Sequence, residues 1–286
     1  MANCGFQPAV GCVVESRAMA TEKSVIAESL GRIRERVARA AGRAGRRVDD
    51  VTIVAVSKTF PFEAIRAAYD AGLRHFGENR VQEWESKRER VADLEATWHL
   101  IGHLQSNKAR KAAGLFDRVD SVDSLGLAQK LDAAEGAGTE AARLISSEKS
   151  RRDALPLVSG QAGATKNGAA NGKRLRVLIE VSLGGEITKT GVAEADLAML
   201  AEGVAGLANL ELLGLMTIPP FLDDPERVRP YFRKLRELRD GLVRRVGRAL
   251  PVLSMGMSHD FEIAVEEGAT EIRVGTGIFG ERKLNQ

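Results

Sequence analysis

The sequence has almost no cysteine, and this scarcity restricts both its covalent chemistry and its compartment. Two cysteines, Cys4 and Cys12, occur in 286 residues, and both lie within the first dozen. Two thiols so close to one end cannot cross-link a fold of this length, and no histidine or cysteine partners stand near them at metal-ligand spacing. We therefore expect a reducing, cytoplasmic compartment, with neither a disulfide framework nor a metal site.

Long apolar runs and blocks of one charge are lacking too. No apolar stretch approaches the roughly 20 residues that a membrane-spanning helix needs. The 42 lysines and arginines are interspersed with 39 acidic residues, which gives a net charge of only +3. A chain with this pattern is expected to bind neither a membrane nor nucleic acid.

The N-terminal segment lacks the features of a secretory signal peptide. It has no basic leading region, and its short apolar stretch, Ala9–Val14, is followed at once by Glu15. We expect residues 1–20 to form a disordered extension. Met19 is a plausible alternative start to Met1, because Thr21 can cap the helical pattern that runs from there to about Gly45.

After this first helix, short apolar runs alternate with amphipathic helical patterns. The eight runs are Val51–Val56, Leu73–Phe76, Thr97–Ile101, Phe116–Val119, Leu175–Val181, Leu210–Met216, Val252–Ser254 and Glu271–Val274. Repeated βα units predict a parallel sheet with right-handed crossovers, and eight of them predict a single (β/α)8 TIM-type barrel over residues 21–286. An open doubly wound sheet is the alternative, disfavoured because no G-x-G-x-x-G follows the first run.

One stretch interrupts the alternation. Residues 136–173 are rich in alanine, glycine, serine, asparagine and lysine, with little periodicity. This composition is typical of a flexible insertion in a surface connection.

Lys58 stands at the carboxyl end of the first predicted strand, which is where barrels of this class place their chemistry. The apolar run stops at Ser57, and Pro61 opens the next helical pattern. Partial burial disfavours the ammonium form of a lysine, and a neutral amine is what Schiff-base chemistry with a carbonyl requires. The alternative is an ordinary solvated surface lysine.

Two turns rich in glycine and serine follow the last two predicted strands. The first contains Ser254, Met257 and Ser258, and the second contains Gly275 and Thr276. Exposed backbone amides in such turns bind anions, and βα-barrels often place phosphate sites after strands seven and eight. The alternative is that these residues only make tight turns.

Several other residues at predicted strand ends have two interpretations. Arg273 interrupts an apolar strand, so its side chain points either into the barrel mouth or outward under a helix. Asn79 either lines the mouth or caps the following helix, and Met216 is either core or a cofactor contact. His99 and His103 carry no zinc-ligand spacing.

The motifs at these positions strongly resemble those of the pyridoxal phosphate homeostasis proteins, which are related to the N-terminal barrel of alanine racemase. They are Val54-Ala-Val-Ser-Lys-Thr59, Phe76-Gly-Glu-Asn79, Trp98-His-x-Ile-Gly102 with Leu104-Gln-Ser-Asn107, Gly214-Leu-Met216, Ser254-Met-Gly-Met-Ser258 and Arg273-Val-Gly-Thr276. The resemblance runs from about Thr21 to Arg282. The N-terminal tail and the stretch 136–173 depart from the family pattern without interrupting a motif.

The resemblance implies a cofactor site. Lys58 would carry pyridoxal 5′-phosphate (PLP) as an internal aldimine, and Ser254, Gly275 and Thr276 would hold its phosphate, with Met257 and Ser258 in the same loop. Arg273 would face the pyridine nitrogen, and Asn79 and Met216 would line the ring. Because an arginine stays protonated, it would leave that nitrogen unprotonated and the ring a poorer electron sink.

Three functions are compatible with such a site. The resemblance implies a monomeric PLP-binding protein of vitamin B6 homeostasis, without catalytic turnover, whose partners are PLP and apo forms of PLP-dependent enzymes. An amino-acid racemase is the alternative. It is weakened because Tyr69 and Tyr231, the only tyrosines, lie in predicted helices outside the barrel, although a histidine could replace the second base. A lysine-dependent aldolase for a sugar phosphate is the third, and bound PLP would exclude it.

Overall fold

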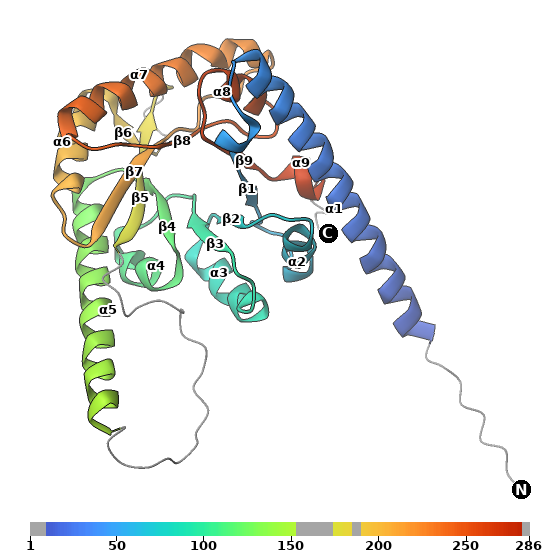
Figure 1. Cartoon of the computed structure of the whole chain (residues 1–286), viewed down its shortest axis with the longest axis horizontal. Coiled ribbons are helices and arrows are strands. Elements are labelled where there is room, and N and C mark those ends of the chain that lie inside the picture. The colour runs from blue at the N-terminus through green and yellow to red at the C-terminus, as the bar shows by residue number, and fades with distance from the viewer. Residues whose placement is uncertain (1–9, 153–173, 185–189, 282–286) are drawn as a thin grey trace, which may run out of the picture.

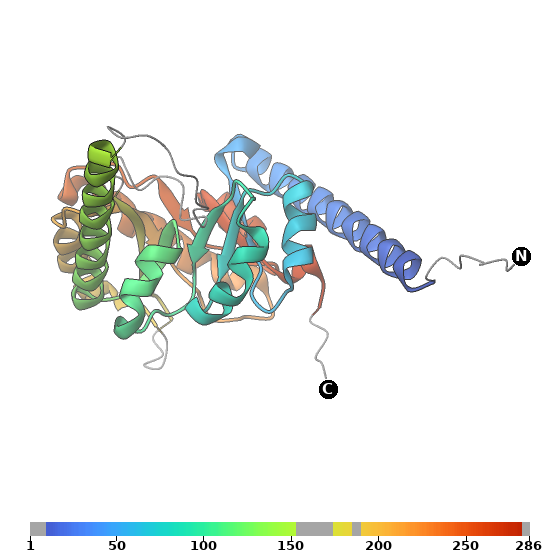
Figure 2. The ribbon, with the colours of Figure 1, turned by 90° about the horizontal axis from the view of Figure 1, so that it is seen from below.

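The protein folds as a closed parallel barrel surrounded by helices (Figures 1 and 2). The computed structural model describes residues 10–152, 174–184 and 190–281. Within them, the barrel strands are β1 (Thr52–Val56), β2 (His75–Glu78), β3 (Thr97–Leu100), β4 (Arg118–Val122), β5 (Leu175–Ser182), β7 (Leu210–Met216), β8 (Val252–Ser254) and β9 (Glu271–Val274). Each pairs in parallel with the next, β9 pairs with β1, and the ring is thereby closed. A two-residue strand, β6 (Val192–Ala193), pairs with the end of β5 outside the ring.

Helices follow the strands and cover the outside of the barrel. They are α1 (Val10–Arg43), α2 (Phe62–Asp70), α3 (Val81–Lys87), α4 (Ala109–Leu115), α5 (Leu125–Arg152), α6 (Glu194–Ala205), α7 (Arg229–Val246), α8 (Phe261–Glu266) and α9 (Thr276–Phe279). Short 3-10 turns extend α3 at Arg88–Val91 and precede α4 at Ser106–Lys108 and α7 at Pro225–Val228. Because each βα unit returns the chain to the same end, all barrel strands have their carboxyl ends on one face, as the sequence predicted.

Helix α1 packs on the barrel with one face only. Ile26, Leu30, Ile33 and Val37 recur at helical spacing and are all buried, whereas Val25 is more than half exposed. The helix lies against α2, α8 and α9, and its N-terminal part extends beyond the body of the barrel (Figure 1). None of the described helices is long and apolar enough to cross a bilayer.

Three of the predicted strands have the same bounds in the structure. The runs 210–216, 252–254 and 271–274 are strands β7, β8 and β9 with the predicted bounds. Strand β2 instead begins at His75 and continues through Gly77 and Glu78, two residues beyond the predicted run Leu73–Phe76. Both residues are paired with β3, so ladder hydrogen bonds to a neighbouring strand outweigh the local preference of glycine for a turn.

Two predicted boundaries move because helices run further than expected. Helix α1 begins at Val10 instead of Thr21, so the extension predicted over residues 1–20 is shortened, and residues 1–9 lie outside the described part. Helix α5 continues to Arg152, well into the predicted insertion over 136–173, of which residues 153–173 lie outside the described part. The segment added to α5 is rich in alanine, glutamate, arginine and lysine, which favour helix even without an amphipathic pattern, whereas the segment added to α1 contains three valines and only two alanines.

Candidate functional site

The predicted site residues gather at the carboxyl ends of five adjacent strands. In ring order these strands are β2, β1, β9, β8 and β7. Asn79 follows β2, Lys58 follows β1, Arg273 and then Gly275 and Thr276 come from β9, Ser254 with Met257 and Ser258 from β8, and Met216 ends β7. Residues more than 200 positions apart in the sequence therefore share one side of the barrel mouth. Their roles toward a cofactor stay predictions.

Lys58 occupies a turn that continues directly from β1. Ser57 is buried, and its N–H donates to the carbonyl of Gly77 at 3.0 Å, so pairing with β2 persists to the residue before Lys58. Lys58 itself is half-buried. On the other side of the turn, the rings of Phe60 and Phe279 lie 4.8 Å apart and pack it against α9. The turn is therefore anchored on both sides of the lysine.

Arg273 points into the barrel. Its side chain is only 3% exposed, and its guanidinium donates to the Ser254 hydroxyl and to the Thr217 carbonyl, both at 2.8 Å. Burial lowers the pKa of Arg273, and the carboxylates of Glu271 and Glu180 act in the opposite direction. Glu180 lies on β5, which is not a neighbour of β9, so the attraction crosses the interior. The inward alternative left open by the sequence is the one observed.

Thr217 and Glu180, which were not among the predicted site residues, complete the surroundings of Arg273. The Thr217 hydroxyl donates to the Val181 carbonyl at 2.8 Å, which ties the end of β7 to β5. Glu180 is buried and accepts a hydrogen bond from Thr190 at 2.7 Å, and its burial raises the pKa of its carboxyl. A charged residue inside an otherwise apolar strand was the available signal for Glu180, as it was for Arg273.

The two glycine-bearing turns after β8 and β9 lie against each other. The N–H of Gly277 donates to the Ser258 hydroxyl at 3.2 Å, which links them. Gly256 has φ of +92°, and a Cβ there would lie 2.6 Å from the Ala264 Cβ, so the first turn requires glycine. Thr276 is exposed and Ser258 half-buried, so polar groups of both turns are accessible.

Ser254, Asn79 and Met216 are placed differently from one another. Ser254 is fully buried, and its hydroxyl accepts from Arg273. Asn79 is half-buried, and the N-cap position of α3 belongs to Arg80, so Asn79 is not the helix cap that the sequence left open. Met216 is fully buried at the end of its strand.

Below the mouth, the barrel interior holds an ionic network centred on Arg118. Its guanidinium donates to both oxygens of Asp120 at 2.6 and 2.8 Å and to both oxygens of Glu271 at 2.6 Å. Burial alone would raise the pKa of Asp120, but Arg118 and His99 hold it well below its usual range. His99, Asp120 and Glu271 have possible metal-ligand atoms within 4.8 Å of one another. The positive group that contacts both carboxylates, however, is the Arg118 guanidinium.

His75 extends this network and makes stability depend on pH. Its Nδ1 lies 3.0 Å from His99 Nε2. Burial, and then the neighbouring His99, lower the pKa of His75 from 6.5 to about 4. Neutral His75 therefore supports the fold fully above pH ~6.5, and this support is lost as the pH falls toward ~4, where the unfolded chain binds a proton that the native state does not.

We expect the free energy of unfolding to fall more steeply over this interval in the native sequence than in a His75→Gln variant, which cannot take up the proton. Urea unfolding of both proteins at several pH values measures the two slopes. Equal slopes would show that His75 is not held neutral by the fold.

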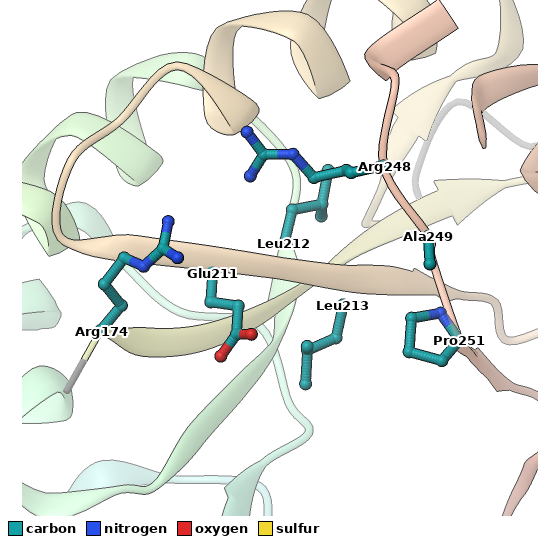
Figure 3. A pocket seen from close by; sticks show the side chains of 7 residues that line it. All are labelled: Arg174, Glu211, Leu212, Leu213, Arg248, Ala249 and Pro251. Carbon is teal, nitrogen blue, oxygen red and sulfur yellow. The ribbon is translucent and has the colours of Figure 1, made fainter. Parts of the chain in front are cut away.

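A pocket of about 430 Å³ lies at the opposite end of the strands (Figure 3). Arg174 precedes β5, Glu211 is near the start of β7, and Pro251 precedes β8. Arg248, on its wall, donates to the carbonyl of Ala205 at 2.9 Å. The amino ends of the strands are remote from Lys58, so this pocket is separate from the candidate site.

Comparison with known proteins connects this arrangement to a family. The family model described as "Alanine racemase, N-terminal domain" matches residues 29–283 of this chain. The pyridoxal phosphate homeostasis protein of Aquifex aeolicus is 46% identical over 256 residues, which is 90% of this chain and 98% of that protein. The corresponding protein of Pseudomonas aeruginosa is 41% identical and covers 91% and 96%. The chain belongs to the pyridoxal phosphate homeostasis protein family.

One solved structure is similar to this chain in both sequence and fold. The structure of PipY from Synechococcus elongatus PCC7942 with PLP bound is 36% identical, has a TM-score of 0.69, and covers 89% of this chain and 100% of its own. These findings confirm the resemblance drawn from the six motifs, together with the barrel fold.

Proposed function

We propose that this protein binds PLP through a Schiff base on Lys58 and takes part in intracellular PLP balance without catalytic turnover. The observation that carries the proposal is the position of Lys58, half-buried at the carboxyl end of β1 and flanked by the strands that bear Arg273 and Asn79. PLP bound to the similar protein PipY supports the same ligand here.

The donor set at the mouth fits PLP. The cofactor supplies an aldehyde, which a lysine amine can bond covalently. Lys58 offers that amine, the linked turns around Ser258 and Thr276 offer amides and hydroxyls for a phosphate, and Arg273 offers a guanidinium. Arg273 donates and cannot accept, so it suits a ring nitrogen that carries a lone pair. With its partners Ser254 and Thr217 fixing its plane, it holds the ligand in one orientation.

Absence of turnover is supported by where the possible second bases lie. Racemisation needs an acid or base on each face of the substrate. Tyr69 is on α2 and stacks under Arg74 outside the barrel, and Tyr231 is on α7. His99 is fully buried in the ionic network, bonded to His75. The His103 side chain is 49% exposed, and its Nδ1 lies 3.4 Å from Asp123 Oδ2. An activity test should therefore include a His103 variant.

The proposal is tested by loading the purified protein with PLP, reducing it with borohydride, and mapping the modified lysine by peptide mass spectrometry. We expect the visible absorption of the loaded protein to be lost on reduction and the adduct to lie on Lys58. An adduct mainly on another lysine would refute the site. Measurable interconversion of L- and D-alanine by the loaded protein would refute the absence of turnover and favour the racemase alternative.

A further inference from the structure

The turn that carries Lys58 has a backbone conformation that needs support. Thr59, directly after Lys58, has φ of +66°, and no other non-glycine residue in the described ranges has a positive φ. This left-handed region is unfavourable for a β-branched side chain and persists only where surrounding contacts impose it. The conformation of Thr59 sets the direction in which the chain leaves Lys58, so whatever holds Thr59 also orients the lysine.

Two residues of α3 supply the support, and they hold the turn on both sides of Lys58. The N–H of Thr59 donates a short hydrogen bond to Glu83 Oε1. The same oxygen accepts from Lys87 Nζ at 2.6 Å, and Lys87 also donates to the carbonyl of Ser57 at 3.1 Å. Glu83 and Lys87 are one helical turn apart, so their pairing is favoured by the helix itself. The side chains are 23% and 12% exposed.

A buried carboxylate completes the support from below. Glu78, at the end of β2, has a fully buried side chain. It accepts from the Ser57 hydroxyl at 2.7 Å and from Lys87 at 3.3 Å. Burial raises the pKa of Glu78, while Lys87 lowers it. Lys87 thus bridges two carboxylates and a backbone carbonyl, a use of all three ammonium protons that fixes its position.

We propose that Glu83 and Lys87 are positioning residues for Lys58: they hold the turn of residues 57–59 so that the lysine amine is presented at the barrel mouth. This inference rests on the proposed function of Lys58, but it concerns residues that are not among the predicted site residues. If Glu83 is lost, Thr59 relaxes toward ordinary φ and the competent conformation becomes a minor one. The apparent rate and affinity of any reaction at Lys58 then fall in proportion to the fraction of molecules that still have the competent conformation.

The experiment compares Glu83→Ala, Glu83→Gln and Glu85→Ala. Glutamine keeps a side-chain oxygen to accept from Thr59, whereas alanine does not. Glu85 lies on the same helix and pairs with Lys111, away from the turn, so its variant is the matched control. Two readouts are taken for each protein: the rate of PLP attachment, and the rate of reductive methylation of Lys58 by formaldehyde and cyanoborohydride in the absence of PLP. Exposed Lys130 on α5 serves as the internal reference.

We expect both rates at Lys58 to fall about tenfold in Glu83→Ala, the size of effect that loss of one charge-assisted hydrogen bond produces. They should stay within about twofold of the native protein in Glu83→Gln and Glu85→Ala. The Lys130 rate should be the same in all. Equal Lys58 rates in Glu83→Ala and the native protein would overturn the proposal, as would a Glu83→Gln variant as slow as Glu83→Ala.

A second variant tests the backbone argument itself. Glycine adopts left-handed φ without cost, so in a Thr59→Gly background the loss of Glu83 should slow Lys58 less than it does in the native background. A loss of the same size in both backgrounds would contradict the role of Thr59. Failure of the proposed function is distinguishable: it would appear as no PLP adduct on Lys58 in the native protein, while the formaldehyde rates would still report on the turn.

Discussion

Replacing Lys58 with alanine is expected to abolish covalent attachment of PLP while leaving the fold nearly intact. Lys58 is the amine at the end of β1, and a Schiff base with the aldehyde can form only on an amine. The side chain is half-buried and follows the strand, outside the hydrophobic core, so its removal should change the free energy of unfolding by about 1 kcal/mol or less. Visible absorption after addition of PLP, and peptide mass spectrometry after borohydride reduction, measure the attachment.

The matched control is Lys130→Ala, which removes an exposed lysine on α5. It should load and reduce like the native protein. Urea unfolding of all three proteins shows whether the barrel is preserved. A Lys58→Ala protein that still gains a reducible adduct in full yield would move the covalent site to another lysine and end the present assignment.

Replacing Arg273 with methionine is expected to cost stability as well as ligand affinity. The guanidinium is buried, donates to Ser254 and Thr217, and balances the carboxylates of Glu180 and Glu271. Removing one partner of a buried ionic group leaves the others uncompensated, which typically costs about 3–5 kcal/mol. Urea unfolding measures this loss. PLP affinity should fall roughly ten- to hundredfold, since one hydrogen bond from a charged donor is lost.

Arg273→Lys separates the two roles of the side chain. Lysine keeps the positive charge among the carboxylates but not the planar fork that reaches two acceptors at once. We expect it to recover most of the stability and little of the affinity. An Arg273→Met protein as stable as the native one would show that the interior charges do not depend on Arg273, and unchanged affinity would remove Arg273 from the site.

Much of the site was predictable because strand ends in a parallel barrel converge. The position of Lys58 after a run of β-branched residues, and of the two glycine-bearing turns after the last strands, follows from the order of elements. Which polar residues are buried was harder to predict from the sequence. The Thr217 carbonyl accepts a hydrogen bond from Arg273, and the Glu180 carboxylate attracts it. Thr217 follows β7 and Glu180 lies in β5, so neither acquires this role until β5, β7 and β9 face one interior.

Element boundaries failed where local composition and tertiary pairing disagree. Gly77 and Glu78 have the composition of a turn, but pairing with β3 keeps them in strand β2. Helix α5 runs to Arg152 through residues that lack an amphipathic pattern, because good helix formers outnumber Gly136 and Gly138 there and no proline interrupts the helix. Predicted bounds follow the periodic pattern of apolar residues, whereas the helices and strands of the folded chain end where their backbone hydrogen bonds end.

The alternation of strands and helices could be predicted from the sequence alone, and with it the barrel, the end of the barrel that carries the site, and the lysine at that end. These properties depend on the spacing of apolar residues along short segments. The inward direction of Arg273, and the hydrogen bond between Glu83 and the backbone of Thr59, 24 residues earlier in the chain, became visible only in the folded protein. Both depend on which side chains meet across the fold, and a hydrogen bond between distant segments is set by their packing and not by either segment alone.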